Sequence, residues 1–173
     1  NIYVDSLDFE TDKLVDFFSQ FLFGFNLKSY TFNKYKTSKK ESIIQKIDYK
    51  IITLKKEKKE RNFKYYNAIK EGVFLTRDLV SEPPNVLNPK AYVDEIKKLS
   101  KLGLKIKSYN EKDLKKLGMN ALLGVGQGSV NESYLVTMEW NGKNNSSNKP
   151  IAFVGKGVCF DTGGISLKPA RFM

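Results

Sequence analysis

Residues 81–92, SEPPNVLNPKAY, divide the sequence into two parts. The prolines at 83 and 84 cannot continue a helix, because proline lacks a backbone N–H and crowds the preceding turn. A few residues later Asn88 is a good helix N-cap, and Pro89 suits the first helical position. The stretch therefore predicts that one helix ends near residue 80 and that a second unit begins with a capped helix.

The part before this stretch predicts two helices with a strand between them. In residues 11–25, TDKLVDFFSQFLFGF, apolar side chains recur at helical spacing behind Thr11 or Asp12 as N-cap. We expect the aromatic stripe of Phe17, Phe18 and Phe21 to be core. Residues 36–42 predict a polar loop, residues 47–54 (IDYKIITL) a strand, and residues 57–80 a long helix.

The part after it alternates helices with strands. The pattern predicts helices at 88–103 and 111–118, which close on Gly103 and Gly118, and strands at 104–110 and 134–140. Residues 121–129 are small and glycine-rich, and we expect a tight turn at 124–129, a hairpin-like loop at 141–149 and a buried strand at 150–158. This order predicts an α/β fold, a layered mixed sheet flanked by helices.

Composition excludes several kinds of chemistry. The 173 residues carry a net charge of +11, one cysteine and no histidine. Without histidine there is no Ser–His or Cys–His catalysis and no histidine-ligated zinc. The single Cys159 forms no internal disulfide, which fits a reducing cytosol. No apolar run reaches the length of about 18 residues that a membrane span needs, so we expect no membrane contact. No signal peptide is visible, although Asn1 in place of methionine suggests a trimmed or partial chain.

Two glycine-rich stretches partly resemble nucleotide-binding motifs. GVGQGS (124–129) has Ser129 where the dinucleotide fingerprint has glycine, and a strand-like stretch follows it where that motif needs a helix. VGKG (154–157) lacks the Ser or Thr that follows the lysine of a phosphate-binding loop. Neither stretch favours nucleotide binding.

Residues 153–170, FVGKGVCFDTGGISLKPA, are a better candidate site. Asp161 offers a hard oxygen ligand for Zn²⁺, Mn²⁺ or Mg²⁺. Lys156 could ligate only as a neutral amine, a form that burial beside a cation favours. Lys168 could return to the same pocket as a cation. The alternative from the residues alone is a strand end with two solvated lysines, and spacing does not decide between them.

The same segment resembles the active-site segment of the leucine aminopeptidases, or cytosol aminopeptidases, which are two-metal exopeptidases. Two further stretches resemble this family in the same order: EGVFLTRDLVSEPPNVLNPKAY (71–92) and EKDLKKLGMNALLGVGQGS (111–129). The resemblance covers about residues 10–173 and is stronger after the long helix. It divides the chain into the end of an α/β amino-terminal domain (1–58), a linker helix (59–80) and the first portion of the catalytic domain (81–173).

The resemblance also implies roles for three residues. Lys156 matches a metal-ligating lysine, Asp161 an aspartate that bridges both metals, and Lys168 a catalytic lysine that binds the substrate carbonyl oxygen. It implies two divalent metal ions, Zn²⁺ or Mn²⁺, and peptide substrates with leucine-like N-terminal residues. It further implies a cytoplasmic homo-hexamer.

The sequence departs from the family pattern at both ends. After Met173 the family has a further aspartate, an Asp-x-Glu pair and an arginine that complete its site. We therefore expect a central fragment that is inactive alone and binds metal weakly. The charge of +11 leaves a second hypothesis, a DNA-binding module, which some bacterial members of the family also are. A solvated basic face is the simpler interpretation, and a third hypothesis is a non-catalytic structural subunit.

Overall fold

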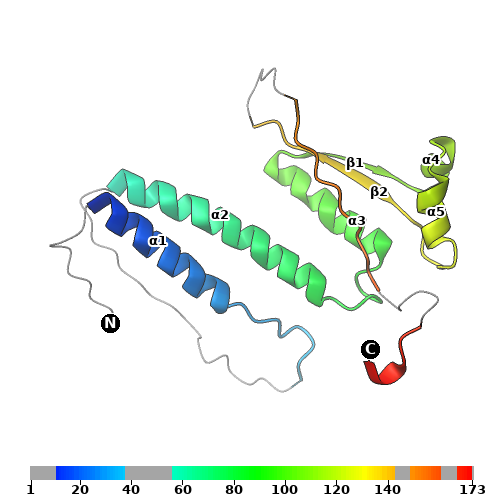
Figure 1. Ribbon diagram of the computed structural model, residues 1–173, viewed down its shortest axis with the longest axis horizontal. Coiled ribbons are helices and arrows are strands. Elements are labelled where there is room, and N and C mark those ends of the chain that lie inside the picture. The colour runs from blue at the N-terminus through cyan, green and yellow to red at the C-terminus, as the bar shows by residue number, and fades with distance from the viewer. Residues whose placement is uncertain (1–10, 38–55, 143–148, 161–166, 173) are drawn as a thin grey trace. The chain divides into compact units, whose positions relative to one another are not determined.

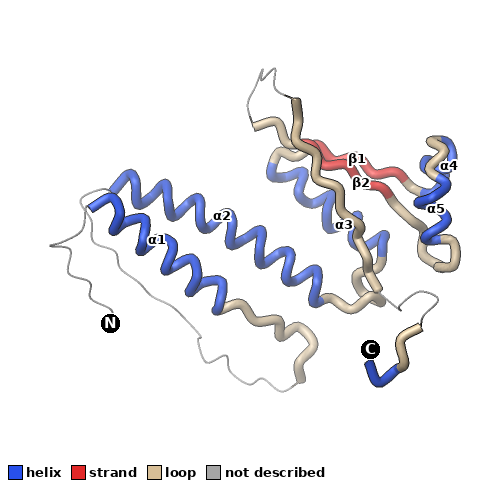
Figure 2. The backbone as a smooth tube through the Cα atoms, in the orientation of Figure 1, coloured by secondary structure: helices blue, strands red, loops and turns tan. Residues whose placement is uncertain are grey.

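The computed structural model describes residues 11–37, 56–142, 149–160 and 167–172, with the side chains of 11–15 and 56–59 left out (Figures 1 and 2). The chain divides into two compact units, Asn1–Ser81 and Glu82–Met173. The expected strand at 47–54 lies outside the described residues. In the described part of the chain, no helix is both long and apolar enough to cross a membrane.

The described residues of the first unit include a pair of helices that run in the same direction (Figure 1). Helix α1 spans Thr11–Lys28 and helix α2 spans Lys56–Ser81. Near their starts, Asn62 Nδ2 donates to Asp16 Oδ1 at 2.7 Å. Near their ends, Arg77 Nη1 donates to the Leu27 carbonyl at 2.6 Å, so a side chain of α2 satisfies a backbone oxygen in the last turn of α1.

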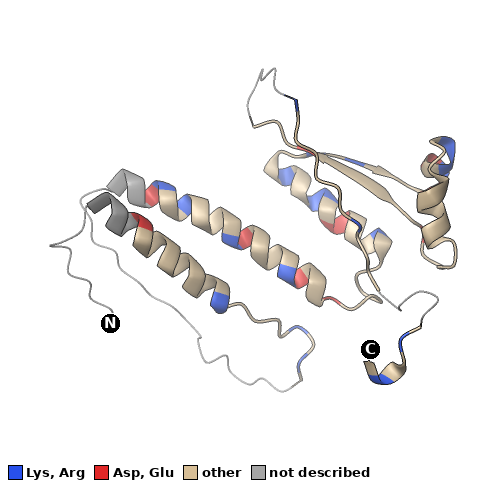
Figure 3. Ribbon diagram, in the orientation of Figure 1, with Lys and Arg blue, Asp and Glu red and all other residues tan. Residues whose placement is uncertain are grey.

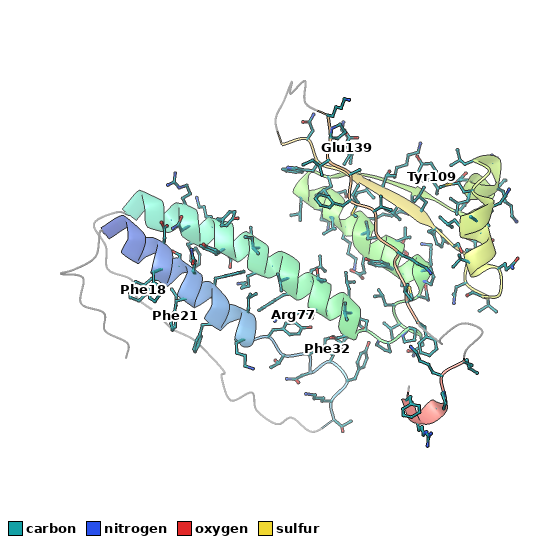
Figure 4. The ribbon with its side chains drawn as sticks, viewed as in Figure 1. Phe18, Phe21, Phe32, Arg77, Tyr109 and Glu139 are labelled. Atoms are coloured by element: carbon teal, nitrogen blue, oxygen red, sulfur yellow. The ribbon has the colours of Figure 1, made fainter. Side chains whose placement is uncertain are left out.

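The aromatic stripe of α1 is not a core within the described residues, which corrects the expectation for two of its three members. Phe17 and Phe21 are exposed, and Phe18 is half-buried. Figure 4 shows Phe21 on the side of α1 away from α2. The side toward α2 carries Ser19, which is buried, and Phe23, whose ring centroid lies 5.1 Å from that of Tyr66. The helix pair therefore packs through the less aromatic face of α1.

The second unit opens with the predicted capped helix. Helix α3 spans Pro89–Lys98, and the Ala91 N–H donates to Asn88 Oδ1 at 3.0 Å, as an N-cap requires. A short 3₁₀ helix, η1 (Leu99–Leu102), continues it and ends at Gly103, whose φ of 91° lies in the left-handed region. The predicted end of this helical segment is confirmed. Glycine fits there because it has no Cβ to crowd the following carbonyl oxygen in left-handed backbone.

Two antiparallel strands follow. Strand β1 spans Lys105–Tyr109 and β2 spans Leu135–Glu139, with Lys105 opposite Glu139 and Tyr109 opposite Leu135. The ends of Lys105 and Glu139 form a loose ion pair of 3.8 Å between exposed side chains. Helices beside a sheet confirm the α/β fold class.

Two short helices, α4 (Glu111–Lys116) and α5 (Asn120–Gly126), connect β1 to β2 in the sequence. Asn110 and Asp113 form a reciprocal capping box at the start of α4, and Leu114 in its interior is fully buried. The expected turn at 124–129 is wrong for residues 124–126, which are the end of helix α5. At Gly126 a side chain would collide with Ser133, so this glycine is set by close packing and not by a turn.

Basic and acidic side chains alternate along α2 and α3 (Figure 3). On α3, Lys90 pairs with Asp94 and Lys98 with Glu95, each at 2.6 Å. Exposed pairs of this kind stabilise a fold very little. They do show that part of the positive charge of α3 is balanced locally, which favours a solvated face over a continuous basic stripe.

Gly103 and Gly118 both have positive φ, so alanine substitutions at the two positions can be compared to test whether Trp140 packs on Gly103, at the end of η1. Alanine at Gly103 or at Gly118 (φ 69°) should each cost about 1–2 kcal/mol of unfolding free energy, because a Cβ is strained in left-handed backbone. Only at Gly103 would the new Cβ also lie 3.2 Å from Trp140 Cζ3. Trp140 is the single tryptophan, so its fluorescence reports the site directly.

We expect Gly103→Ala to shift the emission of the folded protein and Gly118→Ala to leave it unchanged, while both lower the urea midpoint. Equal spectra for the two variants would show that Trp140 does not pack on Gly103 in solution.

Candidate metal centre

The segment before the candidate site is extended, and the expectation of a buried strand at 150–158 is wrong for the described residues. Phe153 and Val154 are 93% and 98% exposed. Residues 149–157 belong to neither strand of the described sheet, which contains only β1 and β2. A strand buries its side chains and pairs its backbone only between neighbours, so an apolar sequence alone does not make one.

One contact does position this segment against the rest of its unit. A Cβ on Gly157 would lie 2.9 Å from Cε1 of Tyr92, a residue of α3, whereas a Cβ on Gly155 would meet nothing within 4 Å. The backbone beside Lys156 thus approaches an aromatic ring of α3 through a glycine. No sequence signal links Tyr92 to Gly157, because the residues are far apart in the chain and the contact depends on tertiary packing.

The structure describes two of the three predicted site residues, and these two differ in exposure. Lys156 is exposed in the extended segment, and Asp161 lies outside the described residues. Lys168 is half-buried, two residues before the 3₁₀ helix η2 (Ala170–Phe172), in which the Phe172 N–H donates to the Pro169 carbonyl at 2.8 Å. The structure therefore leaves the proposed association of the three side chains untested.

The described donors do not fit a metal by themselves. Among the described residues, no group of three or more Cys, Asp or Glu side chains comes together to hold an ion. A lysine ligand also needs burial to favour its neutral form, and Lys156 is exposed to solvent. The described part of the chain contributes at most an incomplete set of ligands.

Cys159, between Lys156 and Asp161, gives no sign of reactivity. Its side chain is half-buried, and this burial raises the pKa of the thiol. A raised pKa leaves less thiolate, which is the nucleophilic and metal-binding form. The cysteine is better described as a packing residue than as a nucleophile.

A pair of substitutions tests the Tyr92 contact. Gly157→Ala should lower the unfolding free energy by about 1–2 kcal/mol relative to Gly155→Ala, because only the former crowds a ring. Urea unfolding of the full chain, followed by Trp140 fluorescence, measures both. If the two variants unfold alike, Gly157 does not pack on α3.

Comparison with known proteins extends over nearly the whole chain. The family described as "Cytosol aminopeptidase family, catalytic domain" matches residues 74–173. A "Probable cytosol aminopeptidase" of Agrobacterium fabrum is 47% identical over 175 residues, which cover 99% of this chain and 35% of the relative. One of Phytoplasma mali, with the same name, is 45% identical and covered to the same extent.

A solved structure is similar in fold. "Bottromycin maturation enzyme BotP in complex with Mn" superposes with a TM-score of 0.73 and 28% sequence identity, over 97% of this chain and 33% of that one. The chain thus spans about a third of the length of the proteins that it matches. With a family match over residues 74–173 and 47% identity to a named relative, the chain belongs to the cytosol aminopeptidase family.

Proposed function

We propose that this chain is part of a metal-dependent aminopeptidase that releases N-terminal residues, preferably leucine-like ones, from peptides. The observation that carries the proposal is the family match over 74–173, which includes the whole segment from Lys156 to Lys168. The similar maturation enzyme was solved in complex with Mn, which supports a divalent cation as cofactor for this chain as well.

The proposed site uses three residues of this chain. Lys156 and Asp161 hold two divalent ions, Zn²⁺ or Mn²⁺, together with ligands that this chain does not contain. Bound there, such ions would polarise a peptide carbonyl and lower the pKa of bound water. Lys168 donates hydrogen bonds to the substrate carbonyl oxygen and stabilises the negative charge that develops there.

The remaining properties follow the family resemblance. We propose a homo-hexamer in the cytoplasm as the working form, with residues 1–58 as the end of an amino-terminal domain and 59–80 as a linker helix. The chain alone should be inactive, because one aspartate and one lysine are too few to hold two ions. DNA binding is not favoured, since acidic partners balance part of the charge of α3.

A chimaera tests the function without any further sequence. These 173 residues would replace the matching third of the Agrobacterium fabrum relative, to which they are 47% identical. We expect the chimaera to hydrolyse leucyl-p-nitroanilide when Mn²⁺ or Zn²⁺ is present. We expect the isolated chain to show no hydrolysis above background.

Single substitutions in the chimaera assign the roles. Lys168→Met should lower kcat on the order of 10²-fold or more, as the loss of one oxyanion donor does elsewhere. Lys156→Met and Asp161→Asn should abolish activity at low metal concentration. Exposed Lys149, to which no role is assigned, provides the control Lys149→Met. An active chimaera that tolerates all three site substitutions would refute the assignment.

A further inference from the structure

Asn141 is followed by Gly142, and this is the only Asn–Gly pair in the 173 residues. The pair lies just beyond the end of β2 at Glu139. Both residues are exposed and belong to neither a helix nor a strand. Within the part of the chain that the structure describes, the Gly142 N–H donates no backbone hydrogen bond. The pair is therefore open to water, and no strand pairing holds its backbone.

An asparagine side chain can react with the backbone that follows it. The nitrogen of the next residue loses its proton and attacks Cγ of the asparagine, so an N–Cγ bond forms while the Cγ–Nδ2 bond breaks and ammonia leaves. Water then opens the resulting succinimide ring at either of its carbonyls, which gives aspartate or its β-linked isomer. The net change is the gain of water and the loss of ammonia. Glycine favours the attack, because it has no Cβ to crowd the approach and its backbone is the least restricted.

Other asparagines of the chain lack this combination. Asn88 precedes Pro89, whose nitrogen carries no proton to lose. The side chain of Asn110 is held as a helix cap, since its Oδ1 accepts the Asp113 N–H at 3.1 Å. Asn120 is the first residue of α5, where helical geometry restricts the backbone. Sequence and local structure together therefore single out Asn141.

The indole of Trp140 restrains Gly142. A Cβ on Gly142 would lie 2.8 Å from Trp140 Nε1 and 3.6 Å from Cδ1, so the five-membered ring rests on this glycine. The six-membered ring meets the turn after η1, because a Cβ on Gly103 would lie 3.2 Å from Trp140 Cζ3. The indole thus contacts two glycines that are far apart in the sequence. The Gly142 nitrogen reaches Cγ of Asn141 only if the backbone of the pair rotates, and the contact with the indole opposes that rotation.

We propose that Asn141 is a site of spontaneous deamidation and that Trp140, by holding Gly142, slows the reaction in the folded chain. The product carries a new carboxylate two residues after Glu139, which forms the loose ion pair of 3.8 Å with Lys105. A β-linked product also lengthens the main chain between the indole and Gly142. Ageing of the chain therefore changes both charge and packing where β2 ends. The reaction needs neither a metal nor a peptide substrate, so it is independent of the proposed aminopeptidase activity.

Mass spectrometry of the aged full chain tests the site. Trypsin releases residues 117–143 as one peptide, which carries Asn120, Asn131 and Asn141 and allows their rates to be compared directly. After incubation of the native chain in mildly alkaline buffer, we expect deamidation of Asn141 to be several-fold faster than that of Asn131, which is also exposed but precedes glutamate. Part of the product should be isoaspartate, which an isoaspartyl methyltransferase labels. Equal rates at Asn141 and Asn131 would overturn the proposal.

Two glycine variants test the role of Trp140. Gly103→Ala crowds the indole, whereas Gly118→Ala introduces left-handed strain with nothing within 4 Å of the new Cβ. We expect deamidation of Asn141 to be several-fold faster in Gly103→Ala than in the unsubstituted chain, and unchanged in Gly118→Ala. Asn120 should stay slow in both variants, which shows that unfolding is not the cause, and the difference should vanish in urea. Equal rates at Asn141 in the two folded variants would contradict the role of the indole.

Discussion

A β-strand is stable only when its backbone groups find partners in neighbouring strands, and this requirement governs the second unit of the chain. In the second unit, β1 and β2 satisfy each other along one edge. Residues 149–157 follow the same sheet in sequence but have no place in it among the described residues, and their apolar side chains face solvent. The candidate ligand Lys156 lies within this segment and is exposed there.

The same dependence applies to the proposed metal ligand Lys156. A lysine becomes a metal ligand through burial, and burial of Lys156 requires that the strand before it enter a sheet. The chain covers 35% of a relative to which it is 47% identical. The contact between Tyr92 and Gly157 holds this segment against α3.

Local rules predicted those elements whose causes are local. Asn88, Gly103 and Gly118 mark helix ends correctly, because caps and left-handed glycines act within one turn, whereas the Asn110 cap of α4 was not predicted. The same rules failed where tertiary packing decides. Gly126 lies at the end of α5, where Ser133 leaves no room for a side chain, and residues 150–158 have no partner strand in the described sheet. For the site, the residues alone left metal binding and solvated lysines open, and only the family resemblance assigned roles to Lys156, Asp161 and Lys168.

The central claim is that these 173 residues hold part of a two-metal site and need the rest of the protein to complete it. Isothermal titration of the isolated chain and of the chimaera with Zn²⁺ or Mn²⁺ measures this most directly. We expect weak, non-saturating heats for the chain and tight binding of two ions for the chimaera, lost on Asp161→Asn. Tight, stoichiometric binding by the isolated chain would contradict the claim.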